Sequence, residues 1–87
     1  SSKLRQPEAA WIAGEVRRLL DTSPELSIGV IAFYSAQVRS ILEEMSRPGR
    51  ELTATDPDTN ELEVAAQWRT LDRDGRKEDR LRVGTVD

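Results

Sequence analysis

The chain has 87 residues, of which 13 are Lys or Arg and 16 are Asp or Glu, so its formal net charge is 13 − 16 = −3. This length allows one small domain at most. The lack of Cys and His excludes disulfides, zinc fingers and catalysis by a cysteine or histidine side chain. Because no stretch approaches the roughly 18 consecutive apolar residues of a membrane span, we expect no contact with a membrane.

The first predicted element is a helix over residues 7–21. Proline at position 7 suits the first helical turn, where its missing N–H is not needed. The apolar face expected from the spacing is formed by Ile12, Val16, Leu19 and Leu20. Arg17 and Arg18 are expected to face away from the core, and Pro24 follows the end of the helix.

A strand is predicted over residues 26–34 and a second helix over residues 35–47. The strand segment is nearly continuous in apolar and β-branched residues, which is typical of a strand covered on both faces. Ser35 is expected to cap the helix, with Glu43 and Glu44 on its exposed side. The expected apolar face consists of Val38, Ile41, Leu42 and Met45. A buried strand followed by an amphipathic helix indicates a parallel sheet.

Residues 48–80 are predicted to form an insertion. Within it, residues 50–60 are polar and have the composition of a loop. Apolar and polar residues then alternate from Leu62 to Arg69, which favours a strand, although this segment would also suit a helix. Asp74-Gly75 is a turn signal, so we predict a hairpin hinged there, and the mixed charges around it favour a solvated surface over a nucleic-acid patch.

The last predicted element is a strand over residues 81–87. The predicted fold class is therefore α/β, with a parallel sheet, flanking helices and a hairpin insertion. A sheet covered on both faces needs more strands and helices than 87 residues contain, so residues 1–87 are expected to be part of a larger α/β domain.

Candidate chemistry lies where the first predicted strand ends. Ligands of open α/β sheets bind beyond the carboxyl ends of the strands, and here Tyr34 is followed by a helix N-terminus, a combination suited to a base and an anion. Alternatively, Tyr34 is a core residue with its hydroxyl at the rim, and Ser35 only caps the helix. The sequence contains no G-x-x-x-x-G-K-[ST] motif, so it cannot by itself bind a triphosphate in the P-loop manner. No metal-binding residues are predicted.

Two segments resemble motifs of one enzyme family. Residues 28–38, Ile-Gly-Val-Ile-Ala-Phe-Tyr-Ser-Ala-Gln-Val, resemble motif IV of the superfamily 1 helicases of the up-frameshift type. Residues 82–87, Arg-Val-Gly-Thr-Val-Asp, resemble the beginning of motif V of the same enzymes. The two segments occur in the family's order, with a variable insertion between them. This chain has Ala32-Phe33 where the family commonly has Thr-Pro.

The resemblance implies a partial RecA-like domain of the P-loop NTPase type, the second motor domain of an ATP-dependent DNA or RNA helicase. ATP and Mg²⁺ are the implied cofactors of the intact enzyme. The implied partners are single-stranded DNA or RNA and the first RecA-like domain of the same chain, and the implied location is cytoplasmic. These 87 residues alone are not expected to hydrolyse ATP, and no catalytic residue is assigned.

Four site residues are expected, namely Tyr34, Gln37 and Thr85 from the resemblance and Ser35 from its place at a helix N-terminus. Tyr34 is expected to stack on the adenine, and Gln37 is expected either to contact the nucleotide or to shape the start of its helix. Ser35 and Thr85 are expected to contact nucleic acid. The alternative to a helicase segment is a non-catalytic α/β protein-interaction module that binds a partner through a strand edge or the hairpin.

Overall fold

Both predicted helices form, and their bounds are close to those expected. The structure is a computed structural model that describes residues 6–86. Its elements in chain order are α1 (Gln6–Thr22), β1 (Ile28–Ala32), α2 (Ser35–Met45), β2 (Thr53–Thr55), β3 (Leu62–Val64), α3 (Ala66–Arg69), β4 (Thr70–Arg73), β5 (Arg76–Asp79) and β6 (Leu81–Thr85). Asp87, at the end of the predicted 81–87 strand, lies outside the described residues.

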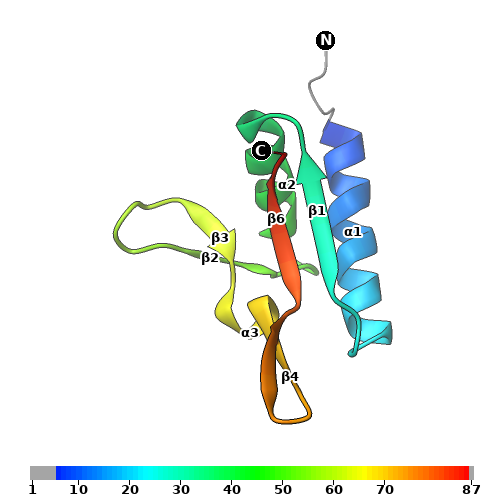
Figure 1. Cartoon of the computed structure of the whole chain (residues 1–87). Helices are drawn as coiled ribbons and strands as arrows, with labels where there is room; N and C mark the ends of the chain where they lie inside the picture. Colours follow the sequence, from blue (N-terminus) through cyan, green and yellow to red (C-terminus); the bar gives the residue numbers. More distant parts are fainter. Residues whose placement is uncertain (1–5, 87) are drawn as a thin grey trace.

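The centre of the fold is a parallel pair of strands. β1 and β6 pair in register from Ile28 with Leu81 to Ala32 with Thr85, although α2 and the whole insertion separate them in the sequence. Figure 1 shows the two strands side by side, with their carboxyl ends at the same edge. The predicted α/β class with a parallel pair is confirmed. In residues 6–86, no helix is long and apolar enough to cross a membrane.

The core lies between the two helices and one face of this strand pair. Its buried members are Ala9, Ala13, Val16 and Leu20 of α1, Ile41, Leu42 and Met45 of α2, and Leu52, Val64 and Leu81. Two of the helix α1 residues are alanines, whose small side chains let the helices approach closely. The apolar face predicted for α2 is therefore confirmed. The face of α1 is rotated towards Ala9 and Ala13, which are fully buried.

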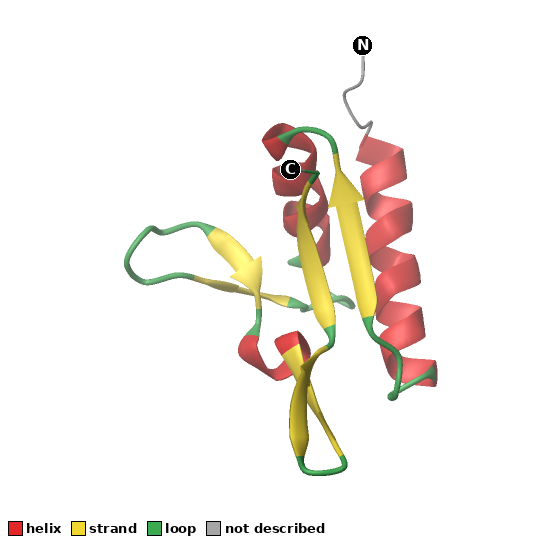
Figure 2. Ribbon diagram, in the orientation of Figure 1, coloured by secondary structure: helices red, strands yellow, loops and turns green. Residues whose placement is uncertain are grey.

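The expectation that β1 is covered on both faces is not met within the described residues. Side chains alternate along the strand, so Ile28 and Val30 pack against the core while Ile31 is 64% exposed. Phe33, just beyond the strand, is 73% exposed. The continuous apolar run predicted two buried faces, but in residues 6–86 both helices lie on the same side of the strand pair (Figure 2).

Part of the predicted polar loop is a strand. Thr53–Thr55 pairs antiparallel with Leu62–Val64, and the connection is organised by Asp56. The Asp56 carboxylate accepts hydrogen bonds from the N–H of Asp58 at 2.7 Å and of Thr59 at 3.3 Å, which is an Asx-turn geometry. The polar composition of residues 50–60 predicted a loop. The short strand within this segment is stabilised by pairing with β3, which the composition does not indicate.

The alternation from Leu62 to Arg69 does not continue as one strand. The chain leaves β3 at Ala65, whose N–H donates to Leu52 O at 2.9 Å, and then forms the single turn α3. This turn places Trp68 next to Arg17 of α1, whose guanidinium carbon lies 4.9 Å from the centre of the indole ring. The guanidinium carbon of Arg80, between β5 and β6, lies 5.6 Å from the same centre. Arg17, expected to face away, thus packs against the insertion.

The hairpin predicted at Asp74-Gly75 is confirmed. β4 and β5 pair antiparallel on either side of these two residues, which have φ values of 54° and 80°. Two successive positive φ angles are the signature of a type I′ turn. The hairpin projects away from the core (Figure 1), and every β5 side chain is exposed, as the mixed charge of this segment predicted.

Candidate nucleotide and nucleic-acid site

The two segments that resemble helicase motifs meet at one edge of the strand pair. Ala32, the last residue of β1 and part of the motif IV segment, pairs with Thr85 of the motif V segment. The N–H of Val86 then donates to Ala32 O at 3.0 Å, so the two chain segments stay together beyond the last paired residues. This is the edge at which open α/β sheets bind their ligands.

Tyr34 lies at this edge with its side chain 53% exposed. Its backbone is extended, with φ −131° and ψ 148°, and it occupies the N-cap position of α2. The first interpretation of Tyr34, as an accessible aromatic at a strand end, therefore agrees with its exposure.

Ser35 is not the helix cap. It is the first residue of α2, no side-chain hydrogen bond caps the helix from position 34, and Ser35 is exposed. The start of α2 is instead fixed from inside the helix. The Gln37 side-chain Oε1 accepts hydrogen bonds from the N–H of Phe33 at 3.0 Å and of Tyr34 at 3.1 Å.

Gln37 therefore shapes the turn between β1 and α2, which is one of the two roles left open for it. Its side chain is only 8% exposed, and a side-chain carbonyl at this position satisfies two backbone donors that a helix start otherwise leaves free. A Gln three residues after an aromatic, at the third position of a predicted helix, is the sequence signal that could have indicated this.

Thr85 ends β6 and is partly buried, on the same face of the strand pair as Leu81 and Val83. Ser35 and Thr85 thus lie at the ends of neighbouring segments, and Tyr34 is between β1 and α2 at the same edge. The structure brings all four assigned residues to one edge of the strand pair (Figure 1).

The carboxylates do not assemble at this edge. Among residues 6–86, no group of three Asp or Glu side chains could hold a metal ion. Glu44, expected on the exposed side of α2, is in fact 6% exposed and pairs with Arg47, with Nε and Oε1 3.0 Å apart. On α1, the hydrogen bond and charge of Glu15 raise the pKa of Arg18, far from the edge.

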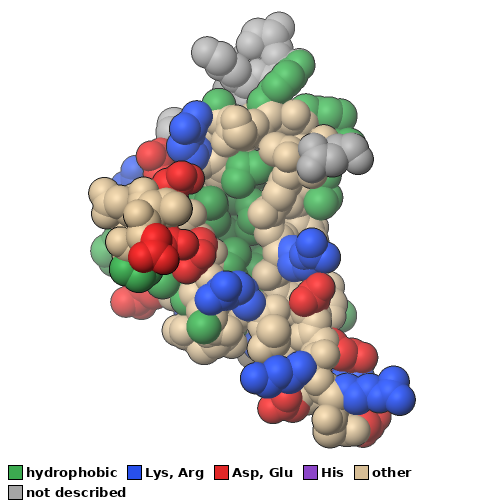
Figure 3. Space-filling model, turned by 60° about the vertical axis from the view of Figure 1, so that its left-hand side comes forward, with side chains coloured by type: hydrophobic (Ala, Val, Ile, Leu, Met, Phe, Trp, Pro, Cys, Tyr) green, Lys and Arg blue, Asp and Glu red, His purple; other side chains and the backbone are tan. Residues whose placement is uncertain are grey.

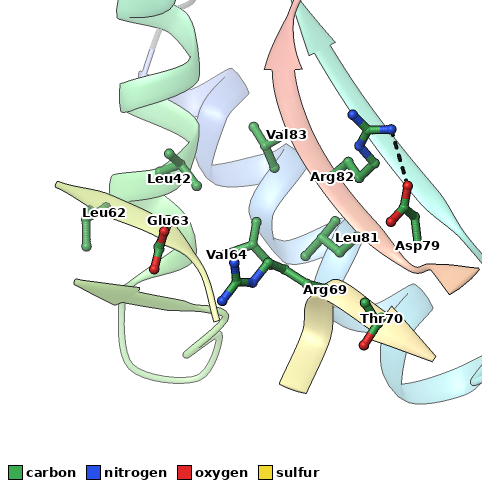
Figure 4. A pocket seen from close by; sticks show the side chains of 10 residues that line it. All are labelled: Leu42, Leu62, Glu63, Val64, Arg69, Thr70, Asp79, Leu81, Arg82 and Val83. Carbon is green, nitrogen blue, oxygen red and sulfur yellow. Dashed lines mark hydrogen bonds and ion pairs between the residues drawn. The ribbon is translucent and has the colours of Figure 1, made fainter. Parts of the chain in front are cut away.

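A hollow of about 400 Å³ lies away from this edge (Figure 4). Its apolar floor includes Leu42, Val64 and Val83, and charged side chains of the insertion, Glu63 and Arg69, border it. None of the four assigned residues lines it. Sequence reasoning missed this hollow because it forms only when β3 packs next to β6. The sequence pattern of the two strands does not indicate that they are close in space.

Comparisons with protein-family models, with curated proteins and with solved structures found no match to this chain.

Proposed function

We propose that this chain forms part of the second RecA-like motor domain of an ATP-dependent helicase of superfamily 1. The observation that carries the proposal is the pairing of Ala32 with Thr85. The two segments that resemble motifs IV and V are far apart in the sequence, yet the strands within them, β1 and β6, are parallel neighbours whose carboxyl ends lie together. A domain that binds nucleotide and nucleic acid beyond its strand ends requires this arrangement.

In this proposal the residues at the strand edge have different roles in binding the nucleotide. The exposed face of Tyr34 stacks on the adenine of ATP, and stacking of this kind tolerates any purine. Gln37 holds the backbone of Phe33 and Tyr34 and so fixes the direction in which the tyrosine ring points. Hydrolysis of bound ATP supplies the free energy for relative movement of the two motor domains.

The hydroxyl groups of Ser35 and Thr85 contact phosphate groups of a single strand of DNA or RNA. Ser35 adds to the free N–H groups at the start of α2, which favour an anion. Mg²⁺ and the phosphates it binds require carboxylates and a P-loop that residues 6–86 do not bring together, so these groups belong to the first motor domain in this proposal.

Stimulated ATPase activity of the full-length gene product tests the proposal. We expect phosphate release from ATP to rise when single-stranded DNA or RNA is added, and Tyr34→Ala to abolish most of that activity at low ATP concentration. Tyr34→Phe keeps the ring and serves as the control. A folded full-length protein that binds no ATP, with or without nucleic acid, would refute the proposal.

A protein-interaction module is the second candidate function. The observation that favours it is the outer face of the β1–β6 pair, where Ile31 is 64% and Val86 is 55% exposed. Apolar side chains gathered on an exposed face are common at protein-binding sites. The same ATPase measurement separates the two candidates, because a module of this kind has no nucleotide-dependent activity.

A further inference from the structure

The tip of the β4–β5 hairpin places a carboxyl group next to a backbone nitrogen with which it can react. Asp74 is directly followed by Gly75, and no other aspartate of the chain precedes a glycine. Both residues are exposed. Figure 3 shows charged side chains of both signs at the lower end of the molecule, where the hairpin projects from the core. Water therefore has access to the turn.

Neither of the two groups is held by a partner. The antiparallel ladder closes at the pair Arg73 and Arg76, and among residues 6–86 the N–H of Gly75 donates to no backbone acceptor. The Asp74 carboxylate forms no ion pair within the described part of the chain. By contrast, the Asp56 carboxylate accepts two backbone N–H groups. The Asp74 carboxyl carbon and the adjacent nitrogen are therefore free to approach each other.

Glycine at position 75 leaves room for this approach. Even a Cβ atom built on Gly75 would meet no heavy atom within 4 Å, and glycine has no side chain of its own to hinder the nitrogen. Every other described aspartate is followed by proline, which has no N–H, or by a residue with a larger side chain. The turn also opens at little cost, because every β5 side chain is exposed and few buried contacts are lost.

We propose that Asp74-Gly75 is a site of covalent modification at which aspartate converts to isoaspartate. The backbone nitrogen of Gly75 attacks Cγ of the protonated Asp74 carboxyl group and closes a five-membered succinimide ring. The proton of the nitrogen and the hydroxyl group of the carboxyl leave together as one molecule of water. Water then cleaves one of the two bonds from the nitrogen to the ring carbonyl carbons. Cleavage at Cγ restores aspartate, and cleavage at the main-chain carbonyl carbon gives isoaspartate.

Isoaspartate lengthens the turn by one backbone carbon. A two-residue type I′ loop sets the register of the strands that it joins, so the pairing of β4 with β5 is lost near the tip. The hairpin is tied to the segment before β1, where Arg73 donates to Glu25 O and Ser27 Oγ donates to Asp79 O at 2.8 Å. The modification therefore loosens these contacts and leaves the core between the helices and the β1–β6 pair intact. It does not depend on the helicase proposal.

Ageing of the full-length protein tests the proposal. The folded protein is kept in mildly acidic buffer at physiological temperature for weeks, beside a synthetic peptide of residues 69–80. A protease that cleaves after glutamate releases residues 64–78, and electron-transfer fragmentation distinguishes isoaspartate from aspartate of the same mass. We expect isoaspartate at position 74 of both samples and none at Asp72. Conversion of the peptide without conversion of the protein would overturn the proposal, as would equal conversion at Asp72.

Two variants separate the reaction from the stability of the turn. Gly75→Ala strains the turn at φ 80°, so the turn opens more often, yet most of the isoaspartate should be lost because the new methyl group hinders the nitrogen. Asp74→Asn suits the same turn and should form the same succinimide faster, with ammonia as the leaving group. Asp72→Asn is the matched control and should react far more slowly. More isoaspartate in Gly75→Ala than in the wild type would overturn the assigned attack by the Gly75 nitrogen.

Discussion

The side-chain Oε1 of Gln37 accepts a hydrogen bond from the backbone N–H of Tyr34 at 3.1 Å. The same oxygen accepts from Phe33 at 3.0 Å, so one buried amide fixes two consecutive residues of the turn between β1 and α2. Without it, both N–H groups would lose their partner at the position where the chain changes from strand to helix. The exposed ring of Tyr34 is therefore carried by a turn with a defined conformation.

Replacing Gln37 tests this role. Gln37→Leu should lower the free energy of unfolding by about 1–3 kcal/mol, because two partly buried backbone donors lose their acceptor. Gln37→Glu keeps an acceptor at the start of a helix, where negative charge is favourable, and should lose less. Urea denaturation followed by circular dichroism measures both. Gln67→Leu, on an exposed residue of α3, is the control, and a loss as large as that of Gln37→Leu would contradict the role.

Replacing Tyr34 tests the nucleotide contact. In the full-length protein, Tyr34→Ala should weaken ATP binding by about 1–3 kcal/mol, the amount typical of one lost base stack on an aromatic ring. Tyr34→Phe should bind ATP as the wild type does. Fluorescent nucleotide titration gives the affinities. Phe33→Ala removes an adjacent aromatic that is more exposed, and a loss confined to this variant would move the stacking contact from Tyr34 to Phe33.

Replacing Trp68 tests the packing of the insertion on α1. Trp68→Leu keeps an apolar side chain but loses the cation–π contacts with Arg17 and Arg80, so stability should fall by about 1–2 kcal/mol. Trp68→Phe keeps a ring face and also removes an indole N–H that has no hydrogen-bond partner among residues 6–86, so the loss of stability should be smaller. Denaturation curves recorded by circular dichroism give the values.

Trp11→Leu is the matched control for Trp68, because Trp11 is on the same helix as Arg17 but is 67% exposed. Its replacement should change stability by less than about 0.5 kcal/mol. If Trp68→Leu is equally mild, the stacked arginines contribute nothing to the docking of the insertion.

Two glycines give a test of the hairpin turn. Gly75→Ala places a Cβ at φ 80° and should lower the free energy of unfolding by about 1 kcal/mol. Gly84→Ala in β6 has open space around the new methyl group and should be neutral or slightly stabilising, since glycine weakens a strand. Chemical denaturation of both variants measures the two free energies of unfolding. A similar loss of stability at both positions would show that the positive φ angle of Gly75 is not the cause.

The helices and the central strands could be predicted from the sequence because their signals are local. The spacing of Ile41, Leu42 and Met45 places them on one helix face whatever surrounds the helix, and Asp74-Gly75 indicates a turn through its own backbone preferences. The edge with Tyr34 and Thr85 could be expected from the resemblance, and the parallel pairing of β1 with β6 brings these residues together.

The remaining features depend on partners that the sequence does not indicate. Thr53–Thr55 is a strand because Leu62–Val64 pairs with it, and Arg17 is partly buried because α3 carries Trp68 to it. Glu44 is buried by neighbouring elements although its helix position alone predicted exposure. Length, composition and periodicity therefore determined the α/β class and the order of the main elements. Only the tertiary structure decided which face of β1 is covered and where the hollow beside β6 lies, because both follow from contacts between segments distant in the sequence.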